Sequence, residues 1–194
     1  MNCNLLTKRP KTSKAVEIDW DTPATVGALV IIENGNNTFT SGGVTVTVNH
    51  HWFDANGDPE DSLYLRHQSD PNGRRDWPGN FAPNAALLWT ERLGGLDGPI
   101  QVRFHKPVQC AGAQIQTREP GLEDKGKFVA MLKAYDVDHK PLGAFTCKCL
   151  SGANADDKAQ FMGITGSGIA SIEFSVDAAK YPNGFAINFL SVIP

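Results

Sequence analysis

The chain has 194 residues, of which 41% are hydrophobic and 20% are charged, and its formal net charge is −3. This length is enough for one domain that buries its own core, and the charge balance gives no basis for nucleic-acid binding. No stretch approaches the roughly 20 apolar residues of a membrane span, so no membrane insertion is expected.

The chain opens on an arm, residues 1–14, that contains a basic run of Lys8, Arg9, Lys11 and Lys14. Its threonine, serine and proline content favours a flexible, solvated arm over one that binds nucleic acid or membrane. The first residues also lack the apolar stretch of a signal peptide. Either the protein is intracellular, or a leader has been removed or lies outside this sequence.

Three strands are expected between the arm and residue 50. Residues 15–20 alternate apolar and polar side chains, and 26–32 form a continuous apolar run typical of a strand buried on both faces. The Asn34-Gly35 pair predicts a turn, because both residue types tolerate positive φ. Residues 38–49 alternate again, and the Ser41-Gly42-Gly43 stretch predicts a bulge or a break in that strand.

Residues 50–84 are mostly long polar loops rich in proline and glycine. Long ordered loops in a compact β-domain are where binding residues gather. Asp54, Asn56 and Asp58 alternate oxygen-bearing side chains, the ligand type that calcium prefers. Their surroundings do not match an EF-hand, so the alternatives are another kind of calcium site and a plain polar turn.

Trp52, Arg74, Arg75, Asp76 and Trp77 lie in the same loops and form the candidate ligand-binding set. Aromatic rings stack on the apolar faces of sugar rings, while arginine and carboxylate groups bond the hydroxyls. The alternative is that the two tryptophans pin the loops to the body of the domain.

Residues 99–136 carry the clearest β pattern. Apolar and polar side chains alternate over 100–105, 111–116 and 128–134, as in strands with one buried face. In the first segment the polar face carries Gln101, Arg103 and His105. The residues at 111–113 are small, which suggests a bulge or the close approach of an opposing sheet.

Further strands follow to the end of the chain. Residues 137–141 predict a hairpin turn into a partner strand at 142–150. Residues 159–165, 169–176 and 185–193 complete the pattern, with Ala170, Ile172, Phe174 and Val176 expected to point inward. The frequent turns and the lack of a helical period predict a single all-β domain over 15–194, a two-sheet antiparallel β-sandwich of jelly-roll type.

The four cysteines are too few for a disulfide scaffold and lack a zinc-binding spacing. Cys147 and Cys149 would share one face of a strand, which is poor geometry for a bond between them. Buried free thiols are therefore favoured, with a disulfide from Cys110 to one of these two left open.

No catalytic motif is recognisable. His50 and His51 are adjacent and would point to opposite faces of a strand, so they cannot chelate one metal together. The Gly166-Ser167-Gly168 stretch lies in a predicted turn rather than in a nucleophile elbow. Nothing in the sequence selects two carboxylates as a catalytic pair.

The later part of the chain resembles a known group of domains. The resemblance covers about residues 85–193 and rests on six segments: Gly-Pro-Ile-Gln-Val-Arg-Phe at 98–104, Ala-Gly-Ala-Gln-Ile-Gln at 111–116, Phe-Val-Ala-Met-Leu-Lys-Ala-Tyr-Asp at 128–136, Leu-Gly-Ala-Phe-Thr at 142–146, Phe-Met-Gly-Ile at 161–164 and Ile-Ala-Ser-Ile-Glu-Phe-Ser at 169–175. In this order they resemble galactose-binding-like jelly-roll domains of secreted bacterial proteins. The resemblance implies an extracellular accessory module that binds glycans or surfaces through rim loops, often with a structural calcium ion.

The sequence therefore predicts a non-catalytic module that binds carbohydrate or a cell-surface partner through loops 50–80. The first alternative is a structural protein that assembles with copies of itself. The second is a hydrolase with an unrecognised carboxylate pair.

Overall fold

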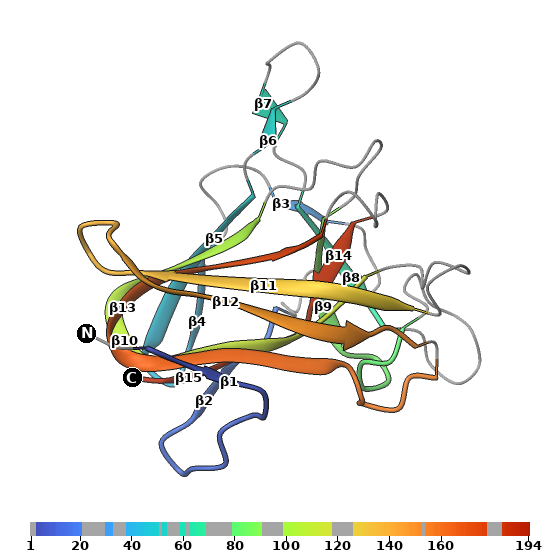
Figure 1. Cartoon of the computed structure of the whole chain (residues 1–194), viewed down its shortest axis with the longest axis horizontal. Coiled ribbons are helices and arrows are strands. Elements are labelled where there is room, and N and C mark those ends of the chain that lie inside the picture. The colour runs from blue at the N-terminus through green and yellow to red at the C-terminus, as the bar shows by residue number, and fades with distance from the viewer. Residues whose placement is uncertain are drawn as a thin grey trace.

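The computed structural model describes residues 3–20, 30–32, 38–50, 52–53, 59–60, 63–68, 79–90, 99–117, 126–152, 154–177 and 184–194. Within these ranges the regular structure is all strand, and each strand pairing is antiparallel (Figure 1). No helix in the described part of the chain has the length and apolar character needed to cross a membrane. The all-β antiparallel sandwich expected from the sequence is confirmed.

Two long strands organise the fold: β10 (Ile100–Thr117) and β13 (Gln160–Val176) pair along most of their length. Their register shifts twice, between Arg103 and Val108 and again between Val108 and Cys110. Before the shift β10 has β5 as its other neighbour, and after it β10 pairs with β14 and β15. Both long strands therefore pass from one layer of the sandwich into the other.

The first layer contains residues 100–104 of β10 and 171–176 of β13. Its other strands are β4 (Thr38–Ser41), β5 (Val44–His50), β11 (Lys127–Tyr135) and β12 (Pro141–Leu150). Along the layer the order is β4-β5-β10-β13-β11-β12. Figure 1 shows β11 and β12 lying side by side along the molecule.

The second layer contains the other halves of β10 and β13. Its other strands are β1 (Asn4–Leu6), β2 (Val16–Ile18), β3 (Val30–Ile32), β8 (Leu63–His67), β9 (Ala86–Thr90), β14 (Phe185–Ile187) and β15 (Leu190–Ile193). A separate two-stranded pair is formed by β6 (Trp52–Phe53) and β7 (Pro59–Glu60).

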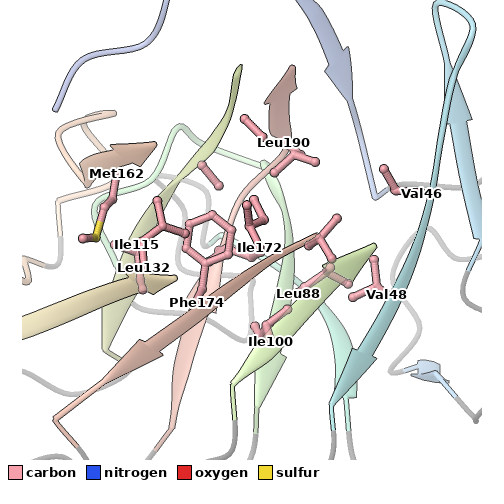
Figure 2. Close-up of a cluster of buried hydrophobic side chains, with 14 of the residues drawn as sticks. Val46, Val48, Leu88, Ile100, Ile115, Leu132, Met162, Ile172, Phe174 and Leu190 are labelled. Atoms are coloured by element: carbon pink, nitrogen blue, oxygen red, sulfur yellow. The ribbon is translucent and has the colours of Figure 1, made fainter. Parts of the chain in front are cut away.

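The hydrophobic core lies between the two layers. Figure 2 shows side chains of both layers meeting there, Val46, Val48, Ile100, Leu132, Ile172 and Phe174 from the first and Leu88, Ile115, Met162 and Leu190 from the second. All ten are fully buried. Burial of apolar surface between the layers is the main favourable contribution to folding.

The described strands differ from the sequence prediction in three respects. The segments 100–105 and 111–116 belong to one strand, β10, rather than to two. The second segment is buried on both faces, so the expected half-buried strand is wrong there: Gln114 and Gln116 are 5% and 0% exposed. Ala170 was expected to point inward, but the register shift places Ile169 in the core and leaves Ala170 half-buried.

The small residues at 111–113 lie at a close approach between two paired strands of the same sheet, rather than between opposing sheets. Gly112 of β10 lies opposite Gly163 of β13, and a Cβ at Gly112 would lie 2.5 Å from the Cα of Gly163 and 2.7 Å from the ring of Phe161. The predicted break at 41–43 is the turn between β4 and β5, where Gly42 and Gly43 have φ of 53° and 80°. Both positive values suit a two-residue hairpin turn.

The N-terminal arm has contacts along its length. Its strand β1 pairs with β13, and the Arg9 guanidinium lies 4.1 Å from the centre of the Phe189 ring. The Gln160 side chain donates a 3.2 Å hydrogen bond to the Thr7 carbonyl. The flexibility of this arm in solution stays a prediction.

Candidate functional site

The outer side of the second layer is covered. The segments 79–85 and 154–159 lie over it, and Phe81 and Ala159 pack there against Leu87, Trp89 and Ala186 in a small second cluster. Two buried glutamines of β10 help to hold these segments. The side-chain amide of Gln116 donates to the Gly152 carbonyl at 2.7 Å, and its oxygen accepts from the Asn80 N–H at 2.9 Å.

Gln114 and Asn188 form the second buried anchor. Asn188 Oδ1 accepts from the Gln114 N–H at 2.9 Å, and its amide nitrogen donates to Gln114 Oε1. The Gln114 amide donates to the carbonyls of Ala159 and Asp157, at 3.0 and 3.2 Å, and the Trp20 indole donates to the Asn188 carbonyl at 2.6 Å. The role of these polar side chains is therefore structural. Because segments cover the outer face of the second layer, the open polar face is that of the first layer.

The outer face of the first layer has a central hollow of about 370 Å³. This volume is within the range of ordinary ligand sites. Its polar side chains come from three elements, β10, β13 and the turn between β11 and β12, and apolar residues lie between them. The lining residues are Gln101, Arg103, Phe104, His105, Pro107, Asp136, Val137, His139, Ala170 and Ser171.

The alternation of β10 explains which of its side chains reach this face. Ile100, Val102 and Phe104 are buried in the core, so Gln101, Arg103 and His105 point to the opposite side. Strand pairing then sets their neighbours, because Arg103 lies opposite Ser171 of β13 and Thr47 of β5. A hydrogen bond of 3.0 Å joins Thr47 Oγ1 to His105 Nε2.

Glu173 is held by two donors on this face. Its Oε2 accepts a 2.9 Å hydrogen bond from the Tyr135 hydroxyl, and its Oε1 accepts one of 3.1 Å from the Gln101 amide. Burial, followed by the hydrogen bond and the negative charge of Glu173, raises the pKa of Tyr135 to about 12. Tyr135 is therefore a protonated donor at neutral pH and a poor general base.

The turn at 136–140 forms one wall of the central hollow and is held by hydrogen bonds to the Asp136 side chain. Asp136 Oδ1 accepts from the N–H groups of Asp138 and Lys140, at 3.0 and 2.9 Å. His139 has φ of 58° and stacks on Tyr135, with ring centres 4.4 Å apart and planes 12° from parallel. The predicted hairpin is confirmed, and Val137 at its tip is 71% exposed.

Two further hollows lie on the same face. The β5 hollow, about 370 Å³, is lined by Thr47, Asn49, Arg103, Phe104 and His105, so it shares three residues with the central hollow. The β11 hollow, about 430 Å³, is lined by Pro99, Val129, Met131, Lys133, Glu173, Ser175, Val176 and Asp177. Polar groups thus continue across four adjacent strands.

A separate hollow of about 430 Å³ lies between the arm and the start of β13. Lys8, Arg9, Lys11 and Lys158 line it. Two of these charges are paired, because Arg9 lies 3.6 Å from Glu17 and Lys158 lies 2.7 Å from Asp156. The remaining lysines, Lys8 and Lys11, are exposed surface residues.

The residues predicted as ligand-binding or metal-binding fall almost entirely outside the described part of the chain. Only the strand position of Trp52, in β6, is described. Arg74, Arg75, Asp76 and Trp77, and Asp54, Asn56 and Asp58, lie outside the described residues. Among the residues that the structure does describe, no group of three or more His, Cys, Asp or Glu side chains is placed to hold a metal ion.

The cysteines are free thiols, as the sequence favoured. Cys110 and Cys149 are buried, while Cys3 and Cys147 are partly buried. Burial raises the pKa of Cys110 to about 11; burial and the neighbouring Cys147 raise that of Cys149 to about 12. These thiols are protonated at neutral pH, which makes them poor nucleophiles.

Comparison with known proteins supports the fold alone. No protein-family model matches the sequence, and no curated protein matches it. Among solved structures, the chain is similar to the crystal structure of a DUF4465 family protein from Bacteroides caccae, with a TM-score of 0.53 and 9% identity. The match covers 92% of this chain and 98% of the other, so the shared architecture extends over nearly the whole of both chains.

Proposed function

We propose that this chain is a non-catalytic carbohydrate-binding module that holds its ligand on the outer face of the first layer. The observation that carries the proposal is the central hollow, where Arg103, Gln101 and His105 project from one strand beside Ser171 and the His139 wall. Hydroxyl, amide and guanidinium groups bond sugar hydroxyls, and the apolar residues between them contact the sugar ring.

The shape of this face favours an extended ligand. Three hollows lie on this face, and Arg103 and His105 line two of them. Glu173 lines the third and bonds Gln101 of the first. A chain of several sugars lying across the strands would contact all three, which suits an oligosaccharide better than a single small molecule.

The chemistry of the described side chains favours binding over catalysis. Glu173 accepts two hydrogen bonds, Asp136 caps a turn, and the raised pKa of Tyr135 keeps its hydroxyl protonated. These groups are fixed in structural bonds, whereas a general acid and base must be within reach of a substrate proton with a pKa near the working pH.

The galactose-binding-like subclass and an extracellular location are parts of this proposal. Their support is the resemblance of residues 85–193 and the accessory role that such modules have. The rim-loop residues around Trp77 remain a competing position for the same ligand, and the experiment below separates the two positions.

The test is affinity electrophoresis through gels that contain a panel of neutral and acidic polysaccharides. Wild type is compared with the double variant Gln101→Ala, His105→Ala in the central hollow and with Trp77→Ala in the rim loops. We expect at least one polysaccharide to retard wild type and Trp77→Ala equally, and the double variant to lose about tenfold in affinity. Retardation lost only in Trp77→Ala would move the site to the rim, and no retardation by any polysaccharide would overturn the function.

A structural calcium ion bound by Asp54, Asn56 and Asp58 is also proposed, on the oxygen chemistry of these side chains. An ion that binds only the folded state stabilises it by about 2.7 kcal/mol at 100 times its dissociation constant. For wild type and for the control Asp138→Asn, the melting curve in calcium should therefore differ from the curve in chelator. For the double variant Asp54→Asn, Asp58→Asn the two curves should coincide. Coincident wild-type curves would remove the proposal.

A further inference from the structure

We infer that the carbohydrate ligand is acidic, and that Arg103 binds the carboxylate of a uronic acid unit at the centre of the site. This inference rests on the proposed function and adds the chemical class of the ligand. It is carried by the position of Arg103 and by the bonding of the acids around it.

Arg103 occupies the middle of the open face. It lies between Thr47 and Ser171 in the strand register and lines both the central and the β5 hollow. Its side chain is exposed, and no acidic group of the described residues lies within ion-pair distance of its guanidinium. An arginine that stands free beside small hydroxyl residues can give both of its parallel N–H groups to a ligand carboxylate.

The acids of the same face are already bonded within the protein. Glu173 accepts from Tyr135 and Gln101, and Asp136 accepts from two backbone N–H groups of its own turn. Lys133, the cross-strand neighbour of Glu173, adds a second positive charge in the β11 hollow and forms no ion pair of 4 Å or less within the described chain. Glu173 and Asp136 keep their negative charges, but their hydrogen bonds are made within the protein, whereas Arg103 and Lys133 have no ion-pair partner among the described residues.

The net charge of the whole chain opposes the binding of anions. With a formal charge of −3 the protein gives a polyanion no general attraction. Selective binding of an acidic chain must then come from the local arrangement at Arg103. Because Arg103 lines both the central and the β5 hollow, neighbouring sugars can lie beside the charged unit, so the ligand passes through the site rather than ending in it.

The test uses four uronate polysaccharides, polygalacturonate, alginate, glucuronan and hyaluronan, each paired with its carboxyl-reduced neutral counterpart. Affinity is measured at physiological ionic strength for wild type, Arg103→Gln, Arg103→Lys and Lys11→Gln. The last removes one positive charge from the separate hollow beside the arm and is the matched control. Melting curves of all four proteins establish that each is folded.

We expect wild type and Lys11→Gln to bind at least one uronate about tenfold or more tightly than its reduced counterpart. Arg103→Gln should bind both members of the pair equally, and Arg103→Lys should keep part of the preference, because a single ammonium replaces a bidentate fork. Added salt should weaken binding of the uronate and spare the neutral polymer.

The two claims fail separately. Equal binding of a uronate and its reduced counterpart by wild type would overturn the acidic class and leave the carbohydrate-binding function in place. A preference that survives in Arg103→Gln would overturn the role of Arg103. Binding of neither member of any pair, nor of any neutral polysaccharide in the panel, would overturn the proposed function itself.

Discussion

The hydroxyl of Tyr135 donates a 2.9 Å hydrogen bond to Oε2 of Glu173, although 38 residues separate them along the chain. The bond joins β11 to β13 on the open face of the first layer. Because Glu173 also accepts from Gln101, it connects three adjacent strands. The same bond fixes the ring on which His139 stacks, so it positions one wall of the central hollow.

Replacement of Tyr135 by phenylalanine should have an effect that depends on pH. The folded protein raises the pKa of Tyr135 from 10.0 to about 12, so the folded state holds this proton more tightly than the unfolded state. The stabilising contribution is therefore fully present below pH 10 and disappears as the pH rises through 12. We expect Tyr135→Phe to lower the free energy of unfolding by about 1 kcal/mol at neutral pH.

Urea denaturation at neutral pH and at several alkaline values measures this difference. The gap between wild type and Tyr135→Phe should narrow above pH 10 and close before pH 12 is reached. A gap that stays constant over this range would show that the Glu173 bond does not hold the proton of Tyr135.

Gln114 should be essential to stability, although it is polar and lies on a strand face that the sequence presents as solvent-exposed. Replacing it with methionine removes the partners of the buried Asn188 amide and of the Ala159 carbonyl. Leaving buried polar groups unbonded costs about 1–3 kcal/mol each, so a loss of about 3 kcal/mol in the free energy of unfolding is expected. Gln109→Met, at an exposed position of the same strand, is the control and should change stability by less than about 0.5 kcal/mol. Equal urea midpoints for the two variants would contradict the anchoring role.

A methyl group at Gly112 should strain the pairing of the two long strands. Its Cβ would lie 2.5 Å from the backbone of Gly163, so β10 and β13 must separate to accept it. We expect Gly112→Ala to lower the free energy of unfolding by about 3 kcal/mol. At Gly152 an added Cβ meets nothing closer than 3.5 Å, so Gly152→Ala serves as the control. Thermal unfolding of both variants measures the difference, and a Gly112→Ala melting temperature equal to that of the control would refute the close approach.

The thiols should react in two groups. Burial protects Cys110 and Cys149 and raises their pKa to about 11 and 12, while Cys3 and Cys147 are partly accessible. With a disulfide reagent at neutral pH, the native protein should release two equivalents well before the others, because the thiolate is the reactive form. In denaturant four equivalents should react quickly. Only two reactive thiols in denaturant would reveal a disulfide, and four fast equivalents in the native state would contradict the burial.

The sequence indicated which side chains share a face, but not which strands lie together. Alternation placed Gln101, Arg103 and His105 on one side of their strand, and the structure agrees. It said nothing about the pairing that brings Ser171, Thr47 and the 136–140 turn beside them, because these partners are far away in the chain. The alternation therefore predicts which β10 side chains face the site, and the strand pairing determines which residues lie beside them.

The errors at Gln114, Gln116 and Ala170 have definite causes. Periodicity reports the polarity of a strand face and not whether another segment covers it. The two glutamines are therefore predicted to be exposed, although residues 79–85, 151–152 and 154–159 bury them. A register shift between β10 and β13 displaced Ala170, and no residue pattern located that shift. The rim-loop prediction at Trp52 and residues 74–77 stays a prediction.

The most direct test of carbohydrate binding on this face is amide chemical-shift mapping of the ¹⁵N-labelled protein. The probe is a short oligosaccharide from whichever polysaccharide retards the wild type most strongly. We expect the largest shifts on Gln101, Arg103, His105 and Ser171 and on the 136–140 turn, with the N-terminal arm unchanged. Shifts confined to residues 50–80, with the outer face of the first layer unmoved, would contradict this expectation.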